Sequence, residues 1–233
     1  MALFDRSLGW LARVLMMTGL VVGVVIPPIL LRLINQLNQC PNTTTWQVLL
    51  VISYLLVFAI LAVTANALMR HYTGEYESQP LKRRDWAIIA GSYAAILILE
   101  GVFQLINQII YHQSQTQNNM VIQDLMAGST LSLWLMALSA VFLTPITEEL
   151  VFRGVLTNLF FKQTWLKVLL SGLVFGSLHS SSTVPSFLIY VTMGLVLATV
   201  YQLTGKIRAA IVLHFIINAF AMSILLLHGS ALN

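Results

Sequence analysis

Residues 144–153 read Thr-Pro-Ile-Thr-Glu-Glu-Leu-Val-Phe-Arg and bring three charged residues into an otherwise apolar part of the chain. An unpaired charge at the centre of a bilayer costs about 2.5–3.5 kcal/mol on insertion scales, so ionisable groups there are candidates for function. On a helix, Glu149 and Arg153 lie four residues apart on one face, in the favourable order for an ion pair. Glu148 points about 100° away from them. The spacing therefore predicts a structural pair, Glu149–Arg153, beside a free carboxylate, Glu148.

The composition around this stretch is that of a membrane protein. Hydrophobic residues make up 58% of the 233 residues and charged residues 9%, whereas soluble domains carry about 25% charged residues. We therefore expect an all-α, polytopic transmembrane helix bundle that forms a single transmembrane domain over residues 1–233 and is surrounded by the lipid bilayer. The net charge of +4 comes from basic residues spread among short loops, so no nucleic acid is expected as a partner.

Apolar segments of about 20 residues predict about seven spans. Their expected bounds are 14–34, 46–68, 86–109, 131–161, 165–180, 186–203 and 209–228. Proline should kink the first span at Pro27-Pro28 and bend the fourth at Pro145. Residues 120–127 are expected to form a short helix on the surface.

The loop charges predict the orientation. With seven spans, Lys and Arg fall on one side of the membrane, apart from Arg32 near the opposite end of the first span. The positive-inside rule then predicts a cytoplasmic N-terminus and a C-terminus outside. The chain is thus expected to be a multi-pass protein of the cell membrane.

Two later polar clusters interrupt apolar spans. Phe175 and His179 share a helix face, as do His214 and Asn218, because each pair is four residues apart. Taken alone, either cluster could be a packing contact worth about 0.6 kcal/mol. The helical rise places Glu148 and His179 about 20 Å along their helices from the cytoplasmic side. His214 and Asn218 also fall between the midplane and that side, so we expect one shared site.

In this order, Glu-Glu-x-x-x-Arg at 148–153, Phe-x-x-x-His at 175–179 and His-x-x-x-Asn at 214–218 resemble the three motifs of the CPBP (Abi) family of glutamic-type intramembrane proteases. That family includes the type II CAAX prenyl endopeptidases and bacterial proteins linked to bacteriocin maturation and self-immunity. The resemblance covers about residues 131–227. It implies hydrolysis of a peptide bond in a membrane-associated peptide or protein substrate. Short loops favour a bacterial member, in the plasma membrane.

The resemblance also implies roles for the motif residues. Glu148 and His179 would activate a water molecule, and His214 with Asn218 would stabilise the oxyanion, with no cofactor. A carboxylate–imidazole pair can act as a general base, and one oxyanion donor is worth about 2.7–4 kcal/mol. The residues expected to support the site are Glu149, Arg153 and Phe175.

Three alternatives stay open. Glu148, His179 and His214 could form a three-ligand zinc site, although the metal-free scheme is preferred because no His-Glu-x-x-His pattern occurs. A non-catalytic immunity or regulatory protein could bind a peptide or a partner protein instead. A transporter could relay protons through Glu100, Glu148 and the histidines, but it would require a polar path across the whole bilayer.

Overall fold

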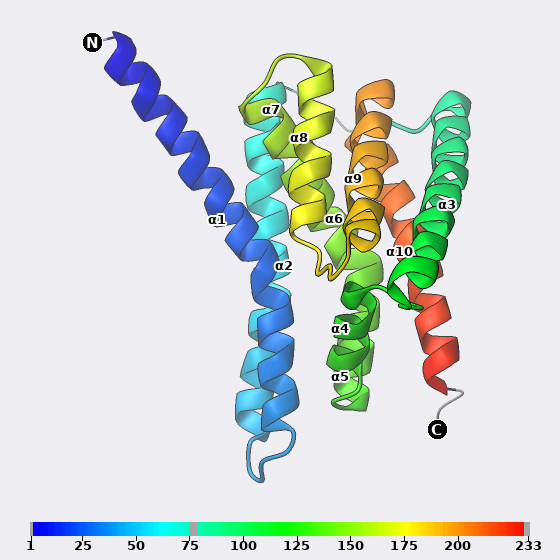
Figure 1. The fold of residues 1–233 in the computed structure, drawn as a ribbon. Coiled ribbons are helices and arrows are strands. Elements are labelled where there is room, and N and C mark those ends of the chain that lie inside the picture. Colours follow the sequence, from blue (N-terminus) through cyan, green and yellow to red (C-terminus); the bar gives the residue numbers. More distant parts are fainter. Residues whose placement is uncertain (1, 75–78, 231–233) are drawn as a thin grey trace.

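The computed structural model describes residues 2–74 and 79–230, with side chains for 9–74 and 79–227, and it is helical throughout these segments apart from short connections (Figure 1). Within these described segments, six helices are long and apolar enough to cross a membrane. They are α1 (Ala2–Leu37), α2 (Thr44–Thr73), α3 (Arg83–Tyr111), the composite helix Thr130–Leu159, α9 (Val184–Thr204) and α10 (Ile207–Ser230). The chain is therefore a multi-pass membrane protein, as its composition predicts.

The prediction of about seven spans is close, and the difference lies in the fifth. Helix α8 (Thr164–Ser177) has 14 residues, about 21 Å, which is shorter than a hydrocarbon core of about 30 Å. The side chain of Thr183 caps the N-terminus of α9 by accepting a hydrogen bond from Ser186 N, and Pro185 occupies the first turn. This early start of α9 makes α8 and α9 a hairpin that turns back inside the bundle (Figure 1). The predicted span 165–180 therefore ends early, and His179 lies in the hairpin tip, residues 178–183.

The fourth span is a continuous but uneven helix. It consists of α5 (Thr130–Leu138), η1 (Ser139–Leu143), α6 (Thr144–Glu148), η2 (Glu149–Leu156) and α7 (Thr157–Leu159). Segments η1 and η2 are π-helical, with wider turns than an α-helix. Pro145 is the second residue after η1, so the irregularity expected at this proline takes the form of a π-helical turn before it. Such π-helical insertions frequently occur at functional sites.

The short helix predicted over 120–127 is present as α4 (Gln117–Met126), and part of it is buried. Its residues Leu125 and Met126 are buried, because Leu125 packs with Leu31 and Ile34 of α1. The side chain of Asn35 also donates a hydrogen bond to Leu125 O at 2.9 Å. Helix α4 is thus packed into the bundle against α1.

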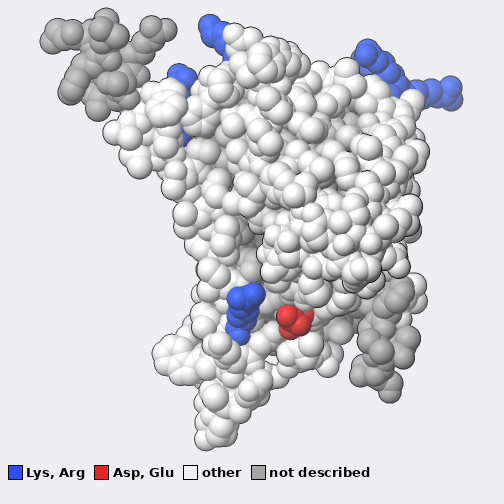
Figure 2. Space-filling model, viewed as in Figure 1, with Lys and Arg blue, Asp and Glu red and all other residues white. Residues whose placement is uncertain are grey.

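The two ends of the bundle differ in charge. The α2–α3, α7–α8 and α9–α10 connections lie at one end, where Lys and Arg side chains gather (Figures 1 and 2). The α1–α2 connection and the end of α10 lie at the other (Figure 1). We call the first the basic end and the second the opposite end. This separation agrees with the charge pattern in the loops, while the compartment that each end faces stays a prediction.

The main hydrophobic core surrounds η2. Its residues Val151 and Val155 are fully buried in a cluster with Ala65 of α2, Leu197 of α9 and Leu213 of α10. Because the core holds η2 from several sides, the charged residues of that segment are fixed within it.

Candidate active site

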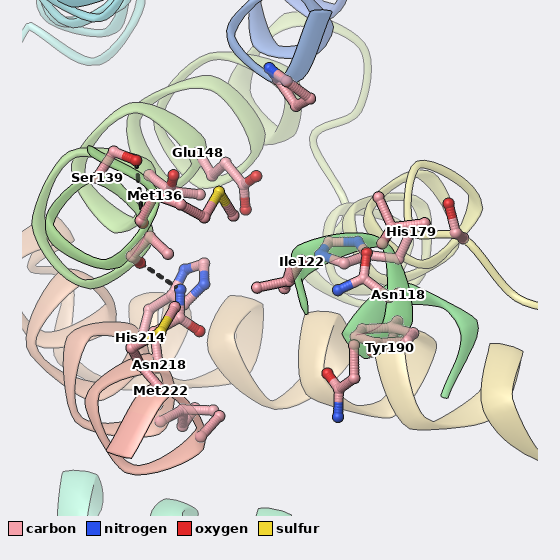
Figure 3. A pocket seen from close by; sticks show the side chains of 18 of the residues that line it. Asn118, Ile122, Met136, Ser139, Glu148, His179, Tyr190, His214, Asn218 and Met222 are labelled. Carbon is pink, nitrogen blue, oxygen red and sulfur yellow. Dashed lines mark hydrogen bonds between the residues drawn. The ribbon is translucent and has the colours of Figure 1, made fainter. Parts of the chain in front are cut away.

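A cavity of about 660 Å³ brings the three sequence motifs together. It is lined by residues of α1 to α4, the fourth span, the α8–α9 tip, α9 and α10. The lining includes all the predicted catalytic residues, which surround the same space in Figure 3: Glu148, His179, His214 and Asn218. Glu100 lines this cavity as well. The shared depth predicted for the motifs therefore corresponds to a common cavity.

Glu148 contributes its carboxylate to the cavity lining. It is the last residue of α6, between the two π-helical segments, and it is buried. Among the described residues, none forms a hydrogen bond with its buried Oε2 atom. A buried polar atom without a partner is costly, and such groups in native structures call for an explanation, which a functional role provides. The carboxylate is available to a water molecule or a substrate in the cavity.

The predicted Glu149–Arg153 ion pair is present. The two side chains are fully buried and meet at 2.8 Å between Nη1 and Oε1. Arg153 Nη2 donates a second hydrogen bond to Gly194 O at 3.1 Å, and the guanidinium lies 4.5 Å from the centre of the Phe175 ring. Because the pair has partners from α8 and α9, it joins three elements behind the cavity wall.

Glu149 has a second partner that the sequence did not reveal. Its Oε1 atom lies 2.7 Å from Nδ1 of His214 on α10. A carboxylate accepts hydrogen bonds, so Nδ1 carries the proton. If the ring is neutral, Nε2 holds a lone pair and accepts hydrogen bonds. Nε2 can donate a hydrogen bond only if the ring is doubly protonated, and Glu149 would then balance its positive charge. This contact fixes the orientation of His214 and restricts how it could serve an oxyanion.

His179 is held by its own helix and by a stacked tyrosine. Its Nδ1 lies 2.8 Å from Phe175 O, so Nδ1 carries the proton and Nε2 holds a lone pair. The centre of the imidazole lies 4.5 Å from the centre of the Phe175 ring. The imidazole also stacks on the Tyr190 ring, with 4.5 Å between the ring centres and 13° between the ring planes. Tyr190 in turn shares a hydrogen bond with Thr116 at 2.8 Å. Neither Tyr190 nor Thr116 belongs to a motif, and no sequence signal identified them.

Polar contacts also fasten the hairpin tip that carries His179. Thr183 Oγ1 donates to Asn107 Oδ1 of α3 at 2.5 Å, and Ser182 Oγ donates to Gln113 Oε1 at 3.0 Å. Asn107 Nδ2 donates to Gln113 O at 3.2 Å. The position of His179 therefore depends on the end of α3 as well as on α8.

Asn218 connects α10 to the irregular helix. Its Nδ2 atom donates a hydrogen bond to Ala140 O in η1 at 2.8 Å. Pro145, five residues after Ala140, has no N–H to offer to that carbonyl, so Asn218 takes the place of a backbone donor. The second N–H of the same amide remains for the cavity.

The alternative zinc site finds no direct support in this arrangement. Among the described residues, no three His, Cys, Asp or Glu side chains are grouped closely enough to hold a metal ion. Figure 3 shows His179 across the cavity from Glu148 and His214. Metal independence itself stays a prediction.

Comparisons with known proteins agree with the motifs. Residues 130–220 match the family described as type II CAAX prenyl endopeptidase, Rce1-like. Over 140 residues the chain is 27% identical to a Bacillus subtilis (strain 168) protein named "Putative membrane peptidase YdiL", covering 59% of this chain and 54% of that protein. The chain thus spans about half the length of this relative, and no solved structure matches it. The match over residues 130–220 and the similarity to the membrane peptidase thus agree with the resemblance of the three motifs to the CPBP (CAAX protease) family.

Proposed function

We propose that this protein is an intramembrane endopeptidase that cleaves a membrane-associated peptide or protein with a water molecule activated by Glu148 and His179. The observation that carries the proposal is the unpartnered buried carboxylate of Glu148 in a cavity that His179, His214 and Asn218 also line. The match of residues 130–220 to the type II CAAX prenyl endopeptidase family supports the reaction class. The reaction needs no metal ion in this scheme.

Two acceptors on different sides of the cavity would orient the water. Glu148 offers its carboxylate, and His179 offers Nε2, because its Nδ1 proton is taken by Phe175 O. A water that donates one hydrogen to each would have a lone pair left for the carbonyl carbon of the substrate. As the new oxygen–carbon bond forms, one proton passes from the water to Glu148.

The negative charge on the former carbonyl oxygen would be stabilised by α10. Asn218 can donate its second N–H, and His214 can donate Nε2–H in its doubly protonated form, with Glu149 as counter-ion. Donors fixed before the reaction are effective because they need no reorganisation when the charge appears. The intermediate collapses when the carbon–nitrogen bond breaks, and Glu148 returns its proton to the leaving nitrogen.

The test compares two carboxylates of the same cavity. Purified protein in liposomes is incubated with a library of fluorescent, palmitoylated decapeptides, and new peptide ends are identified by mass spectrometry. Glu148→Gln keeps the shape and removes the base, so cleavage should fall by at least the 10²–10⁴-fold typical of general-base catalysis. Glu100→Gln makes the same change elsewhere in the lining and should retain cleavage.

Two further results would decide between the alternatives. Chelators should leave cleavage intact, and loss that added zinc reverses would favour the zinc-dependent protease. If the wild type cleaves nothing, or Glu148→Gln cleaves normally, the protease proposal fails. Peptide binding without cleavage would then favour the non-catalytic immunity or regulatory protein.

A further inference from the structure

The cavity extends in one direction from the catalytic candidates. On the fourth span its lining residues Met136, Ser139, Ala140 and Thr144 come before Glu148, on the side of Thr130. On α10 the lining continues past His214 as far as Leu225, near the end of that helix. Both directions lead away from the basic end (Figure 1). A ligand that fills the cavity would therefore approach Glu148 from the opposite end.

Arg32 is the one Lys or Arg among the lining residues described. It stands on α1 near the opposite end and is exposed. Within the described residues, no hydrogen bond or ion pair involves its guanidinium, and the exposed Asp124 of α4 is not in the lining. The nearest lining residues along α1 are apolar, Pro28 and Ile29, while Asn118 and Asn119 of α4 add amide groups to the lining. The lining is largely apolar and also holds the carboxylates Glu100 and Glu148. Arg32 is therefore the group of this lining that would meet a negative charge on an apolar ligand.

The helix contacts place Arg32 at a definable depth. Asn35, one turn after Arg32, accepts a hydrogen bond from Ser132 of α5. Ser132 precedes Glu148 by 16 residues, so Arg32 and Glu148 differ in level by about 18 Å once the turn between Arg32 and Asn35 is subtracted. An extended peptide covers about 3.3–3.6 Å per residue. About five residues would therefore connect the two side chains.

We propose that Arg32 binds a carboxylate of the peptide substrate, about five residues from the bond presented to Glu148. The carboxylate belongs either to the free C-terminus of the peptide or to an acidic side chain. The apolar residues between lie in the cavity, and the substrate approaches from the opposite end. This inference rests on the proposed function, since it describes how the same cavity selects its substrate.

Binding can be measured without catalysis. The Glu148→Gln protein in nanodiscs of neutral phosphatidylcholine is titrated with dansylated Leu-Ala decapeptides that end in a free acid, an amide, or an amide preceded by Glu. At least one carboxylate peptide should bind about tenfold more tightly than the plain amide, as expected for a charge-assisted hydrogen bond. The preference should vanish with Arg32→Gln and largely survive with Arg32→Lys. It should shrink at high salt.

Matched variants separate recognition from folding. Arg208→Gln removes a positive charge from an exposed residue at the basic end and should leave the preference unchanged. Arg32→Glu should reverse it, favouring an amide peptide that ends in Lys. If the acid and amide peptides bind alike, or if Arg32→Gln weakens both equally, Arg32 meets a lipid headgroup or serves the fold, and the proposal is overturned.

Cleavage provides an independent readout. With Glu148 intact, the cut should fall about five residues from the carboxylate and move with it when the acidic residue is shifted along the peptide. Cleavage at sites unrelated to the carboxylate would overturn the Arg32 proposal and leave the protease standing. Carboxylate-dependent binding without any cleavage would overturn the protease and leave the anion site.

Discussion

At the scale of single residues, Glu149 decides how the site is held together. Its Oε1 atom meets both Arg153 Nη1 at 2.8 Å and His214 Nδ1 at 2.7 Å. One carboxylate therefore joins the charge buried in η2 to the histidine of α10. Glu149 was expected to support the site. Its contact with Nδ1 of His214 specifies that support, because it determines which nitrogen of His214 faces the cavity.

Removal of Arg153 should destabilise the protein. Arg153→Ala leaves Glu149 buried without its main counter-charge, and breaking a buried pair in this way costs about 3–5 kcal/mol. The expected result is a lower folded yield and a lower thermal midpoint in detergent. Arg70→Ala, which removes a cation near the end of α2, is the control and should behave like the wild type. Normal yield and melting of Arg153→Ala would remove the ion pair from the structural argument.

At the scale of elements, the hairpin tip shows what the sequence could and could not predict. The four-residue spacing of Phe175 and His179 predicted that the two rings share a face, and they lie 4.5 Å apart. The length of α8 was not predictable from apolar composition, because it depends on the cap of α9 at Thr183 and on a bond from that side chain to α3. The periodicity of a short stretch of sequence carries no information about contacts with residues far away in the chain.

The π-helical turns illustrate the same limit. Pro145 predicted a disturbance of the fourth span, but the form of that disturbance depends on Asn218, which satisfies Ala140 O from another helix. The contact between His214 and Glu149 likewise joins residues 65 positions apart. Motifs thus identified the residues, while tertiary contacts determined their partners.

The tip contacts lead to a prediction about Thr183. Thr183→Val removes both the helix cap, worth about 1 kcal/mol, and the hydrogen bond to Asn107. Residues 178–186 should exchange amide hydrogens faster, and kcat should fall about tenfold while KM changes little, because His179 loses its fixed position. Thr199→Val on the exposed face of α9 is the matched control, since its hydroxyl bonds only within the helix. Equal exchange and equal kcat in the two variants would show that the tip does not depend on this contact.

At the scale of the whole molecule, most basic side chains lie at one end of the bundle and the cavity extends toward the other. Lys and Arg gather at the basic end (Figure 2), whereas the cavity extends from Glu148 toward Arg32 and Leu225 at the opposite end. Glu148 itself lies 11 residues before the end of α7, about 16 Å from the basic end. The fold is therefore compatible with the depth expected for Glu148. The cavity, however, approaches Glu148 from the opposite end of the bundle.

The orientation of the bundle then determines which compartment supplies the substrate. Short loops rich in Lys and Arg are retained in the cytoplasm, so the basic end should face inward and the cavity should open toward the outside. Alkaline phosphatase fused after Asn118 or after Gly229 should be active, because Asn118 follows the end of α3 and Gly229 lies near the end of α10, and both helices end away from the basic end (Figure 1). A fusion after Gly74, which caps α2 at the basic end, should be inactive.

The reverse pattern would place the N-terminus outside and would direct the search for substrates to the cytoplasmic leaflet. A mixed pattern at Asn118 and Gly229 would contradict the number of crossings, since the two positions must share a side if α8 and α9 turn back within the bundle.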